Sequence, residues 1–483
     1  MRLSELMSVL PGIQLPRDVE ISGICFDSRR VKAGDLFVAL VGAKADGHDF
    51  VPGAVGSGAA VVLVERPLAV LSVPQVVVKD ARAALGKLSA RFLDYPSRRI
   101  KVIGVTGTNG KTTTTYLIRS IVQAAGRKVG VIGTIAYSTG VEETEAVNTT
   151  PESLLVQELL SEMVRAGVEY AAMEVSSQAI DQGRVNDVEF AAGVFTNLSR
   201  EHLDYHKTMA AYARAKGLLF GRLPRDAVSV VNGDDRYVGI VVGDRRGVIR
   251  FGFKKGSDVR VVSFETGVKG SRFSILSPWG KMDLATPLPG KHNVYNCVAS
   301  AAVAAALGID PPAIARGIAA LSSVPGRLEP VDAGQDFTVF VDYAHTPDAL
   351  KNVLKTVRKL AANRVIVLFG CGGERDRSKR PRMRAVAEKL ADHCVVTSDN
   401  PRGEDPQDII DQIMRHAADP SRFTVEIDRR AAIARAVAMA RPGDLVLLAG
   451  KGHETWQIFK DRRVHFDDRE VARDVLRKAG STP

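Results

Sequence analysis

Short apolar runs alternate with longer amphipathic segments over most of the chain. Between residues 98 and 175, this pattern predicts strands at 99–105, 128–134 and 170–175 and helices at 113–126 and 151–167. Gly126 is expected to end the first helix, and Pro151 is expected to be the first residue of the second. Strands that alternate with helices predict a parallel sheet covered by helices on both faces.

The pattern starts again near residues 324–332. Four apolar runs beyond that point predict a second parallel sheet, with strands at 338–344, 364–370, 393–399 and 444–450. Before residue 98 the chain has shorter Val-rich runs, at 59–65 and 74–80. At 483 residues the chain is too long for one hydrophobic core. We therefore predict an α/β protein of three domains: a small N-terminal α/β domain (1–97), a central P-loop-type sheet domain (98–328) and a C-terminal Rossmann-like domain (329–483).

Composition narrows the class of partner. The chain is 45% hydrophobic and carries a net charge of +11, but only 6% of its residues are aromatic and no basic run is interleaved with aromatic residues. This favours small polyanionic substrates over nucleic acid. The apolar runs are shorter than the ~20 residues of a membrane helix, and the first residues lack a cleavage signal, so we expect a cytoplasmic protein. The scattered cysteines argue against zinc and disulfides and fit a reducing compartment.

The segment VIGVTGTNGKTTTT, residues 102–115, has the chemistry of a phosphate-binding loop. Gly107 and Gly110 allow backbone N–H groups to turn toward an anion, Lys111 supplies a charge, and Thr112 supplies a hydroxyl for magnesium. The usual spacing would place the first glycine where Val105 stands. The alternative is a glycine-rich turn with an incidental lysine, but the strand–loop–helix context favours nucleotide binding.

Other polar residues follow predicted strands or open helices. Glu174 and His202 are candidate metal ligands, because ligands of a parallel sheet gather beyond the carboxyl ends of its strands. A loop histidine and a solvated helix lysine are the alternatives for His202 and Lys216. Asn293 and Asn296 lie one turn apart and suit the edge of a purine, unless Asn293 only caps its helix.

These residues belong to a recognisable series of motifs. GVTGTNGKTTT, MEVSSQ, TNLSREHLDYH, YARAKGLLF, PGKHNVYN, VPGRLE and VDYAHTPDAL occur in this order, preceded by DSRRVKAGDLFVALVGAKADGHDF. Together they resemble the Mur ligases, ATP-dependent enzymes that add amino acids to the peptidoglycan precursor. The resemblance is greatest to the branch that adds the third amino acid, and GTNGKT is that family's normal loop.

The resemblance implies roles for individual residues, ATP and Mg²⁺ as cofactors, and a monomer. Lys111, Lys216, His202, Glu174 and Arg327 would be catalytic, and the metal ligands would be Thr112, Glu174, His202 and, once carbamylated by CO₂, Lys216. ATP would be bound by Gly107, Thr108, Asn109, Gly110, Lys111, Thr112, Thr113, Asn293, Asn296, Asp342 and His345. The UDP-N-acetylmuramoyl-dipeptide would be bound by Ser28, Gly42, Asp46, Gly47, Asn148, Thr149, Thr150, Ser177, Gln182 and Arg184.

Specificity for the added amino acid is expected at the C-terminal strand ends. FGCGGERDRSKRP, TSDNPRGEDP and LAGKGHETW each follow a predicted strand and converge on one sheet edge. Two arginines for carboxylates and one glutamate for an ammonium predict a receptor for meso-diaminopimelate rather than L-lysine. The alternative for Arg402 is a solvated loop arginine. The set is Arg375, Asp399, Asn400, Pro401, Arg402, Gly450 and Glu454.

Three rival classes share some of these features. Folylpolyglutamate synthetase has the same ATP chemistry but lacks the N-terminal DSR…GDLF block and DNPR. A nucleotide-switch protein would release ADP without any amino acid. A basic nucleic-acid-binding protein would bind RNA or DNA with a steep salt dependence.

Overall fold

The computed structural model describes residues 1–480 except 16, 43, 44 and 70. The chain divides into two compact units. Unit 1 contains residues 1–260, 276–280 and 295–317, and unit 2 contains residues 261–275, 281–294 and 318–483. The N-terminal block and most of the central block thus lie in unit 1, whereas residues 261–275, 281–294 and 318–328 of the central block lie in unit 2. The domain boundaries after residues 97 and 328 remain a prediction.

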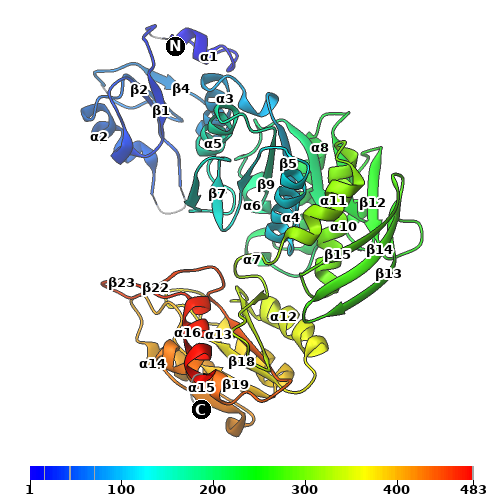
Figure 1. Ribbon diagram of the computed structural model, residues 1–483. Helices are drawn as coiled ribbons and strands as arrows, with labels where there is room; N and C mark the ends of the chain where they lie inside the picture. Colours follow the sequence, from blue (N-terminus) through cyan, green and yellow to red (C-terminus); the bar gives the residue numbers. More distant parts are fainter. Residues whose placement is uncertain (16, 43–44, 70, 481–483) are drawn as a thin grey trace. The chain divides into compact units, whose positions relative to one another are not determined.

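The N-terminal block forms a four-stranded parallel sheet in the order β1-β2-β3-β4 (Figure 1). Alternate residues of β3 face opposite sides, because side chains along a strand have a period of two. Val61 and Leu63 pack with helices α1 and α3, whereas Val62 and Val64 pack with α2. The elements are α1 (Leu3–Met7), β1 (Gly23–Cys25), β2 (Asp35–Val38), α2 (Val51–Gly56), β3 (Val61–Val64), β4 (Gln75–Val77) and α3 (Ala81–Phe92).

The central sheet has eleven strands in the order β15-β14-β13-β12-β11-β10-β5-β9-β6-β7-β8. The strands from β12 to β6 in this order are parallel, and the short β7 and β8 continue the sheet in antiparallel pairing. The strands are β5 (Lys101–Thr106), β6 (Val129–Ile132), β7 (Ala136–Ser138), β8 (Glu143–Glu145), β9 (Tyr170–Glu174), β10 (Phe190–Phe195), β11 (Val228–Asn232), β12 (Val248–Gly252), β13 (Val259–Gly267), β14 (Gly270–Ser277) and β15 (Gly280–Thr286).

Helices cover both faces of the parallel strands, as the sequence predicted. One face packs against α5, α6, α8 and α9 in a single apolar cluster. Helix α4 lies on the other face, where the Ser120 hydroxyl donates to Gly317 O at the end of α11 (2.6 Å). The helices are α4 (Lys111–Ala124), α5 (Ser153–Arg165), α6 (Ser177–Asp181), α7 (Leu203–His206), α8 (Met209–Arg222), α9 (Val238–Val242), α10 (Lys291–Ala306) and α11 (Pro311–Ala320).

Two helix ends test the boundary predictions. Gly126 has φ +71° and directly follows Ala125, the C-cap of α4, so its predicted role in ending that helix is confirmed. The prediction for Pro151 was wrong, because α5 begins at Ser153 with Glu152 as its N-cap. Proline therefore precedes the helix here and fixes the chain that enters it.

The C-terminal sheet has the order β16-β17-β21-β18-β19-β20 and confirms the four predicted strands. Only β16 is antiparallel to its neighbour. Two short strands were not predicted within it, β16 and β20. The strands are β16 (Glu329–Pro330), β17 (Thr338–Asp342), β18 (Val365–Phe369), β19 (His393–Val396), β20 (Phe423–Val425) and β21 (Leu445–Ala449), followed by the hairpin β22 (Trp456–Ile458) and β23 (Arg463–His465).

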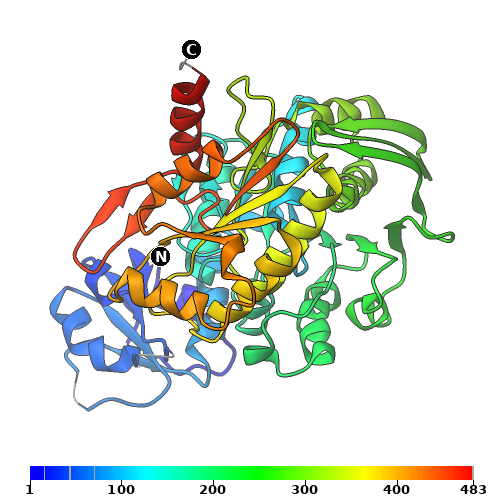
Figure 2. The ribbon, with the colours of Figure 1, turned by 90° about the horizontal axis from the view of Figure 1, so that it is seen from below.

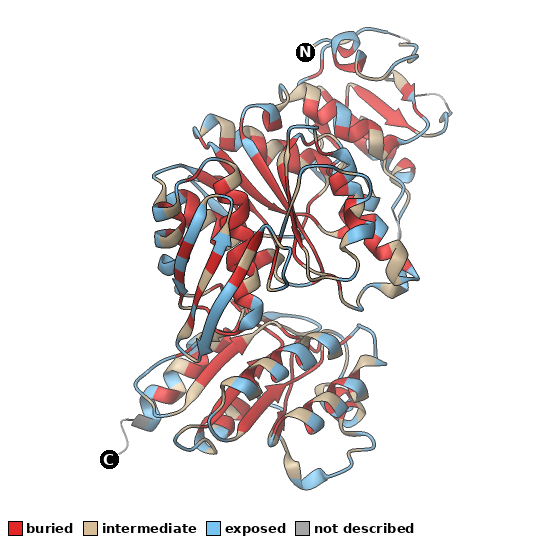
Figure 3. Cartoon of the chain, turned by 90° about the vertical axis from the view of Figure 1, so that its right-hand side faces the viewer, coloured by how far each residue is buried: buried red, intermediate tan, exposed pale blue. Residues whose placement is uncertain are grey.

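Five helices cover this sheet (Figure 2). Val367 packs toward α12, α13 and α14, whereas its neighbours Ile366 and Leu368 pack toward α15 and α16. Strands β17, β18, β19 and β21 are largely buried on both faces, and the helices expose their outer sides (Figure 3). The helices are α12 (Pro347–Leu360), α13 (Lys379–Leu390), α14 (Pro406–Met414), α15 (Arg429–Ala438) and α16 (Asp468–Gly480).

A buried ion pair joins α15 to α16. Arg429 donates to both carboxylate oxygens of Asp468, at 2.8 and 2.6 Å, and both side chains are fully buried. Asp468→Asn is expected to lower the free energy of unfolding by about 3–5 kcal/mol, because it leaves a buried guanidinium without its counter-charge. Asp474→Asn is the matched control, since its pair with Arg430 (3.9 Å) is exposed and is worth less than about 1 kcal/mol. Urea denaturation measures both, and equal effects would contradict the prediction.

All four cysteines of the chain, Cys25, Cys297, Cys371 and Cys394, are buried. Burial raises the pKa of the Cys371 and Cys394 thiols to about 12. Across the described residues, no helix is long and apolar enough to cross a membrane.

Candidate active site

The predicted phosphate loop joins β5 to the start of α4. Gly107 has φ +152° and Gly110 has φ +85°, a backbone region in which glycine is favoured. A Cβ at Gly107 would overlap the Thr196 hydroxyl, and one at Gly110 would overlap the amide of Asn296. Both glycines are therefore required by the conformation of the loop and by the closeness of its neighbours.

Lys111 bends back over this loop. Its ammonium donates to Gly107 O and Thr108 O, each at 3.0 Å. Because Lys111 is the first residue of α4, the N–H groups of the helix start lie beside this charge. The loop thus combines a cation, backbone donors and a helix N-terminus, as an anionic phosphate group requires.

Glu174 ends β9 beside the loop and is almost fully buried. Its Oε2 accepts from the hydroxyls of Thr112 (3.1 Å) and Thr134 (3.0 Å), and its Oε1 accepts from Thr134 N (2.9 Å). Within the described part of the chain, no three His, Cys, Asp or Glu side chains form a metal site by themselves. One carboxylate and one hydroxyl next to a phosphate loop nevertheless fit Mg²⁺, which takes few protein ligands and completes its shell with phosphate and water.

Lys216, on α8, is not the solvated helix lysine of the alternative interpretation, because only 1% of it is exposed. Its amine donates to Gly107 O at 2.8 Å and lies 4.6 Å from the centre of the Tyr212 ring. Burial, reinforced by the charge of Lys111, holds the pKa of Lys216 well below its usual value. The structure therefore places an amine with a weakened affinity for protons directly under the phosphate loop.

His202 lies nearby on a left-handed turn (φ +55°) that begins α7. Its ring centre is 6.0 Å from that of Tyr212, and its Nε2 is 4.0 Å from the Glu201 carboxylate. Burial of one side lowers its pKa. Of the four predicted metal ligands, Thr112 is hydrogen-bonded to Glu174. His202 and Lys216 each lie next to the ring of Tyr212.

Tyr212 was missed by the sequence reasoning, although it lies in the quoted motif YARAK. It is 1% exposed, and its hydroxyl accepts from the Thr108 hydroxyl at 3.3 Å. Its ring stacks on His206 (centres 5.0 Å apart), and His206 Nε2 lies 2.9 Å from the Ser177 hydroxyl. Tyr212 therefore connects the phosphate loop with the segment that follows β9.

The residues expected to hold the muramoyl-peptide gather around Glu174. Thr150 donates to Glu174 O (2.8 Å), and Arg184 donates to Thr150 O (2.9 Å) and to Gln182 Oε1 (2.7 Å). The Thr149 hydroxyl lies 3.0 Å from that of Thr134, which in turn reaches Glu174. The backbone of Asn148 bonds with the Tyr137 hydroxyl. These contacts bring most of the predicted acceptor residues to one place.

The residues expected to hold the uridine-diphosphate end lie in loops of the N-terminal sheet. Asp46 caps a short 3₁₀ helix (Gly47–Phe50) and pairs with Arg66 at 2.8 Å; hydrogen bonds from His48 hold its pKa below the usual range. A Cβ at Gly47 would lie 2.6 Å from the backbone of Leu40, so glycine is required there. Ser28 begins another 3₁₀ helix (Ser28–Arg30), and Gly42 N donates to Ala45 O. Residues 43 and 44 of the GAKADG segment lie outside the described residues.

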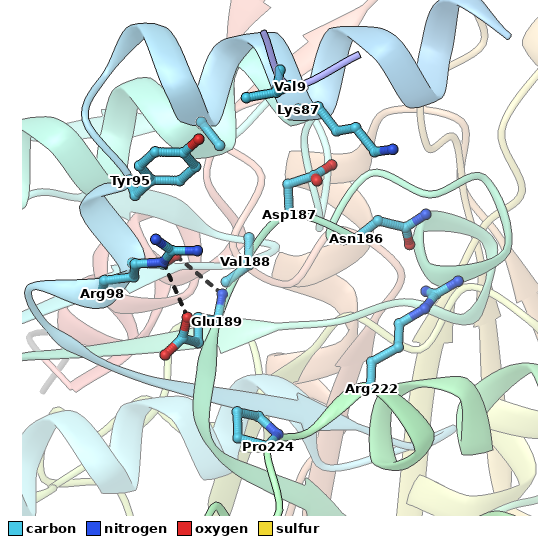
Figure 4. A pocket seen from close by; sticks show the side chains of 12 residues that line it. Val9, Lys87, Tyr95, Arg98, Asn186, Asp187, Val188, Glu189, Arg222 and Pro224 are labelled. Atoms are coloured by element: carbon cyan, nitrogen blue, oxygen red, sulfur yellow. Dashed lines mark hydrogen bonds and ion pairs between the residues drawn. The ribbon is translucent and has the colours of Figure 1, made fainter. Parts of the chain in front are cut away.

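Two cavities open in unit 1. One, of about 330 Å³, is lined by residues of the N-terminal loops, including Val41, and by Gln182 and Gly183 after α6. Among the residues that line this cavity, Gln182 is a predicted acceptor residue, and Val41 directly precedes another, Gly42. The other, of about 470 Å³, is lined by Lys87, Asp187 and Arg222, among others (Figure 4). None of the predicted site residues lines this second cavity, and its three cationic side chains, Lys87, Arg98 and Arg222, are exposed.

Three residues expected to complete the ATP site lie together in unit 2, around Tyr343. Asp342 accepts from Leu328 N (2.8 Å) and Ala344 N (2.9 Å), and burial raises its pKa. The Arg327 guanidinium lies 5.4 Å from the centre of the Tyr343 ring, and His345 Nδ1 lies 2.9 Å from Tyr343 O.

The two asparagines of α10 have separate surroundings. Asn293 is not the N-cap of the alternative interpretation, because it is the third residue of the helix, and its amide donates to Pro289 O at 2.8 Å. Asn296 lies against Gly110 of the phosphate loop. The structure thus brings Asn296 to the nucleotide loop.

The candidate amino-acid site lies at the carboxyl ends of β18, β19 and β21, as expected. Asn400 Nδ2 donates to Glu454 Oε2 at 2.8 Å. Arg402 is half-buried rather than solvated, and its guanidinium donates to Gly373 O (2.9 Å) and Asn400 O (3.4 Å). It occupies the left-handed region with φ +53°. Three of the predicted residues thus form one cluster.

The remaining predicted residues surround this cluster. Burial raises the pKa of the Asp399 carboxyl, but Lys451 and Arg429 outweigh it and hold that pKa below its usual value. A Cβ at Gly450 (φ +118°) would lie 2.8 Å from Asp399 Oδ2. Pro401 is buried and Arg375 is exposed. Lys451 was missed by the sequence reasoning, although it lies in the quoted segment LAGKGHETW.

The fold and the site define a class: an α/β protein with a phosphate-type loop and a second, mainly parallel sheet whose strand ends carry charged groups. Three family models match the chain in order. They are described as Mur ligase family, catalytic domain (residues 20–93), Mur ligase middle domain (105–304) and Mur ligase, glutamate ligase domain (326–452). The chain belongs to the Mur ligase family.

Individual relatives agree with this placement. The UDP-N-acetylmuramoyl-L-alanyl-D-glutamate--2,6-diaminopimelate ligase of Geobacillus thermodenitrificans is 46% identical over 490 residues, covering 99% of this chain and 100% of its own. A solved structure of a ligase with the same name is 31% identical, covers 99% of both chains and superposes with a TM-score of 0.70. Folylpolyglutamate synthase of Mycobacterium tuberculosis shares the fold (TM-score 0.63, 83% of this chain) at 21% identity.

Proposed function

We propose that this chain is an ATP-dependent ligase that joins meso-2,6-diaminopimelate to UDP-N-acetylmuramoyl-L-alanyl-D-glutamate in peptidoglycan precursor synthesis, in the cytoplasm and as a monomer. One observation carries the proposal: a relative named for this reaction, without the meso designation, matches 99% of the chain and the whole of its own length at 46% identity. The N-terminal block, which the folylpolyglutamate hypothesis left unexplained, is part of that match.

The geometry supports carboxylate activation by ATP. A carboxylate is a poor electrophile, because attack adds charge to an anionic centre, whereas an acyl phosphate has a good leaving group. Its formation depends on positioning and charge neutralisation. Thr149 and Thr150 lie within a few hydrogen bonds of Thr112 and Glu174. A peptide acid bound there would be held beside the phosphate loop.

We assign the phosphates of ATP to residues 107–113, and its remaining contacts to Asn293, Asn296, Arg327, Asp342 and His345. The muramoyl-peptide is assigned to the residues from Ser28 to Gly47 and from Asn148 to Arg184 named above. Mg²⁺ would be held by Thr112, Glu174 and His202, and when bound it neutralises the charge of the phosphates. The amine of diaminopimelate must lose a proton to attack, and phosphate then leaves.

We further propose that Lys216 is carbamylated by CO₂. Only a neutral amine attacks CO₂, and burial of Lys216 under Gly107 O favours the neutral form. The reaction forms an N–C bond and releases a proton; it replaces a neutral amine near Lys111 with an anion, which attracts that cation and would add a ligand for a second metal. Intact-protein mass spectrometry under bicarbonate would detect the added CO₂.

A phosphate-release assay tests the ligase assignment. With UDP-N-acetylmuramoyl-L-alanyl-D-glutamate and ATP, release is expected to require an amino acid and to be fastest with meso-diaminopimelate. Oxygen-18 in the acceptor acid is expected to pass into the released phosphate, because the acyl C–O bond breaks. Release of unlabelled phosphate, or release without any amine, would overturn the proposal.

Tyr212→Phe tests the connection between the phosphate loop and the acceptor side. Loss of the hydroxyl removes the contact with Thr108 but keeps the ring under Lys216, so we expect kcat to fall about 5–20-fold, with KM for ATP changing less. Tyr237→Phe is the control, because Tyr237 also lies in unit 1 but has no part in this network. Steady-state kinetics measure both. An unchanged kcat in Tyr212→Phe would contradict the connection.

A further inference from the structure

Lys451 is a fully buried lysine at the carboxyl end of β21, next to the candidate amino-acid site. Its ammonium has three donors and three acceptors: Trp456 O (2.6 Å), Asn400 Oδ1 (3.2 Å) and Glu454 Oε2 (3.4 Å). A buried ammonium is costly unless it is fully hydrogen-bonded and paired with a carboxylate, and Lys451 meets both conditions.

The first consequence concerns the amide of Asn400. Its Oδ1 accepts from Lys451 and from Ile458 N (3.0 Å), so this oxygen is fixed toward two donors. The Nδ2 group must then point the other way, where it donates to Glu454 Oε2 at 2.8 Å. Lys451 therefore determines the orientation of an amide that the site uses.

The second consequence concerns the carboxylate of Glu454. Its Oε2 is held by both Lys451 and Asn400, and a third of its side chain remains exposed. Anchoring one oxygen leaves Oε1 to receive an ammonium group from a ligand. The anchor also connects separate segments, because Trp456 and Ile458 belong to the β22–β23 hairpin.

The third consequence concerns charge. Lys451 is a positive charge shared by two carboxylates of the site: it pairs with Glu454 at 3.4 Å, and together with Arg429 it holds the pKa of Asp399 below its usual value. Without Lys451, both carboxylates lose this charge, and their mutual repulsion is less well compensated.

We propose that Lys451 is a positioning residue that sets specificity for the second ammonium of a diamino acid, by fixing Asn400 and presenting one oxygen of Glu454. The inference rests on the proposed function and adds to it the group that orders the amino-acid site. The three hydrogen bonds of the Lys451 ammonium all go to protein groups, so its effect passes through the side chains of Asn400 and Glu454 that it holds.

Lys451→Met and Lys451→Gln test this assignment. Met removes both charge and hydrogen bonds, whereas Gln keeps hydrogen bonding and removes the charge, so one variant remains informative if the other folds poorly. In both we expect KM for meso-diaminopimelate to rise more than about 10-fold, with KM for ATP within about 2-fold of the original. Lys460→Met, an exposed lysine of the same hairpin, is expected to change neither.

A second readout separates positioning from general damage. We expect the original protein to prefer meso-diaminopimelate over 2-aminopimelate, which lacks one ammonium, and this preference to fall at least about 5-fold in both variants. If the original protein used diaminopimelate but the variants kept their KM and preference, the role of Lys451 would be refuted. If the original protein failed to use diaminopimelate at all, the proposed function would fail first.

Discussion

Lys216→Met is expected to lower the ligase rate about 10²–10³-fold while the protein stays folded. The substitution removes the amine under Gly107 O and, with it, the group that we propose to be carbamylated. Arg214→Met is the matched control, because Arg214 lies on the exposed side of the same helix, and its rate is expected to stay within about 2-fold. Phosphate release under saturating substrates measures both. A Lys216→Met protein with near-normal activity would exclude a catalytic role.

The same variant has an expected signature in stability. The pKa of Lys216 in the folded protein is lower than in the unfolded chain, so the unfolded state binds more protons between the two values. The free energy of unfolding contributed by this residue therefore rises with pH in that window. In CO₂-free buffer, the Lys216→Met protein is expected to be at least as stable as the original protein at pH 7. Its free energy of unfolding is expected to lack the rise with pH that Lys216 contributes. Urea denaturation at pH 7 and 9.5 measures it.

Arg402→Ala is expected to reduce kcat/KM for meso-diaminopimelate about 10²-fold or more, with ADP affinity unchanged. The guanidinium is oriented by Gly373 O and Asn400 O, so removing it leaves a ligand carboxylate without its planar partner. L-Lysine lacks the distal carboxylate and should be used poorly by the original protein. The ratio of the two rates is therefore expected to fall toward one in the variant.

Two further variants make this result specific. Arg402→Lys keeps the charge but not the fork of donors and is expected to recover only part of the activity. Arg402→Gly relieves the left-handed backbone (φ +53°) and is expected to match Arg402→Ala in activity while unfolding at a higher urea concentration. ADP binding by the three Arg402 variants is measured by calorimetry. Loss of ADP binding in any of them would show that Arg402 acts in the nucleotide site rather than in the amino-acid site.

The sequence predicted the central strands β5, β6 and β9 and the C-terminal strands β17, β18, β19 and β21, because their apolar runs are largely buried on both faces and are bounded by glycine and charge. Helix boundaries were predicted less well. Pro151 was predicted as the first residue of α5, but the helix begins at Ser153, with Glu152 as its N-cap. Strands β11 to β15 were not predicted. Most of β13 is exposed on both faces, so the sequence offers no clear apolar run there.

The site shows a similar division. The roles of Gly107, Gly110 and Lys111 could be predicted, because the shape of a phosphate-binding loop determines their spacing. The burial of Lys216 was not readable, since a lysine on a helix usually faces water and only the packing of α8 under the loop reverses this. Lys451 and Tyr212 were missed for the same reason: they act through contacts that form only after distant segments meet.

The burial of every cysteine has a practical consequence for spectroscopy. Thiol-reactive dyes attack the thiolate, and with pKa values near 12 Cys371 and Cys394 hold almost none of that form at neutral pH. A maleimide fluorophore would therefore couple selectively to a cysteine introduced on an exposed face. One such label in each unit would allow energy transfer between the units to be measured with and without ATP, in a protein that keeps all its native thiols.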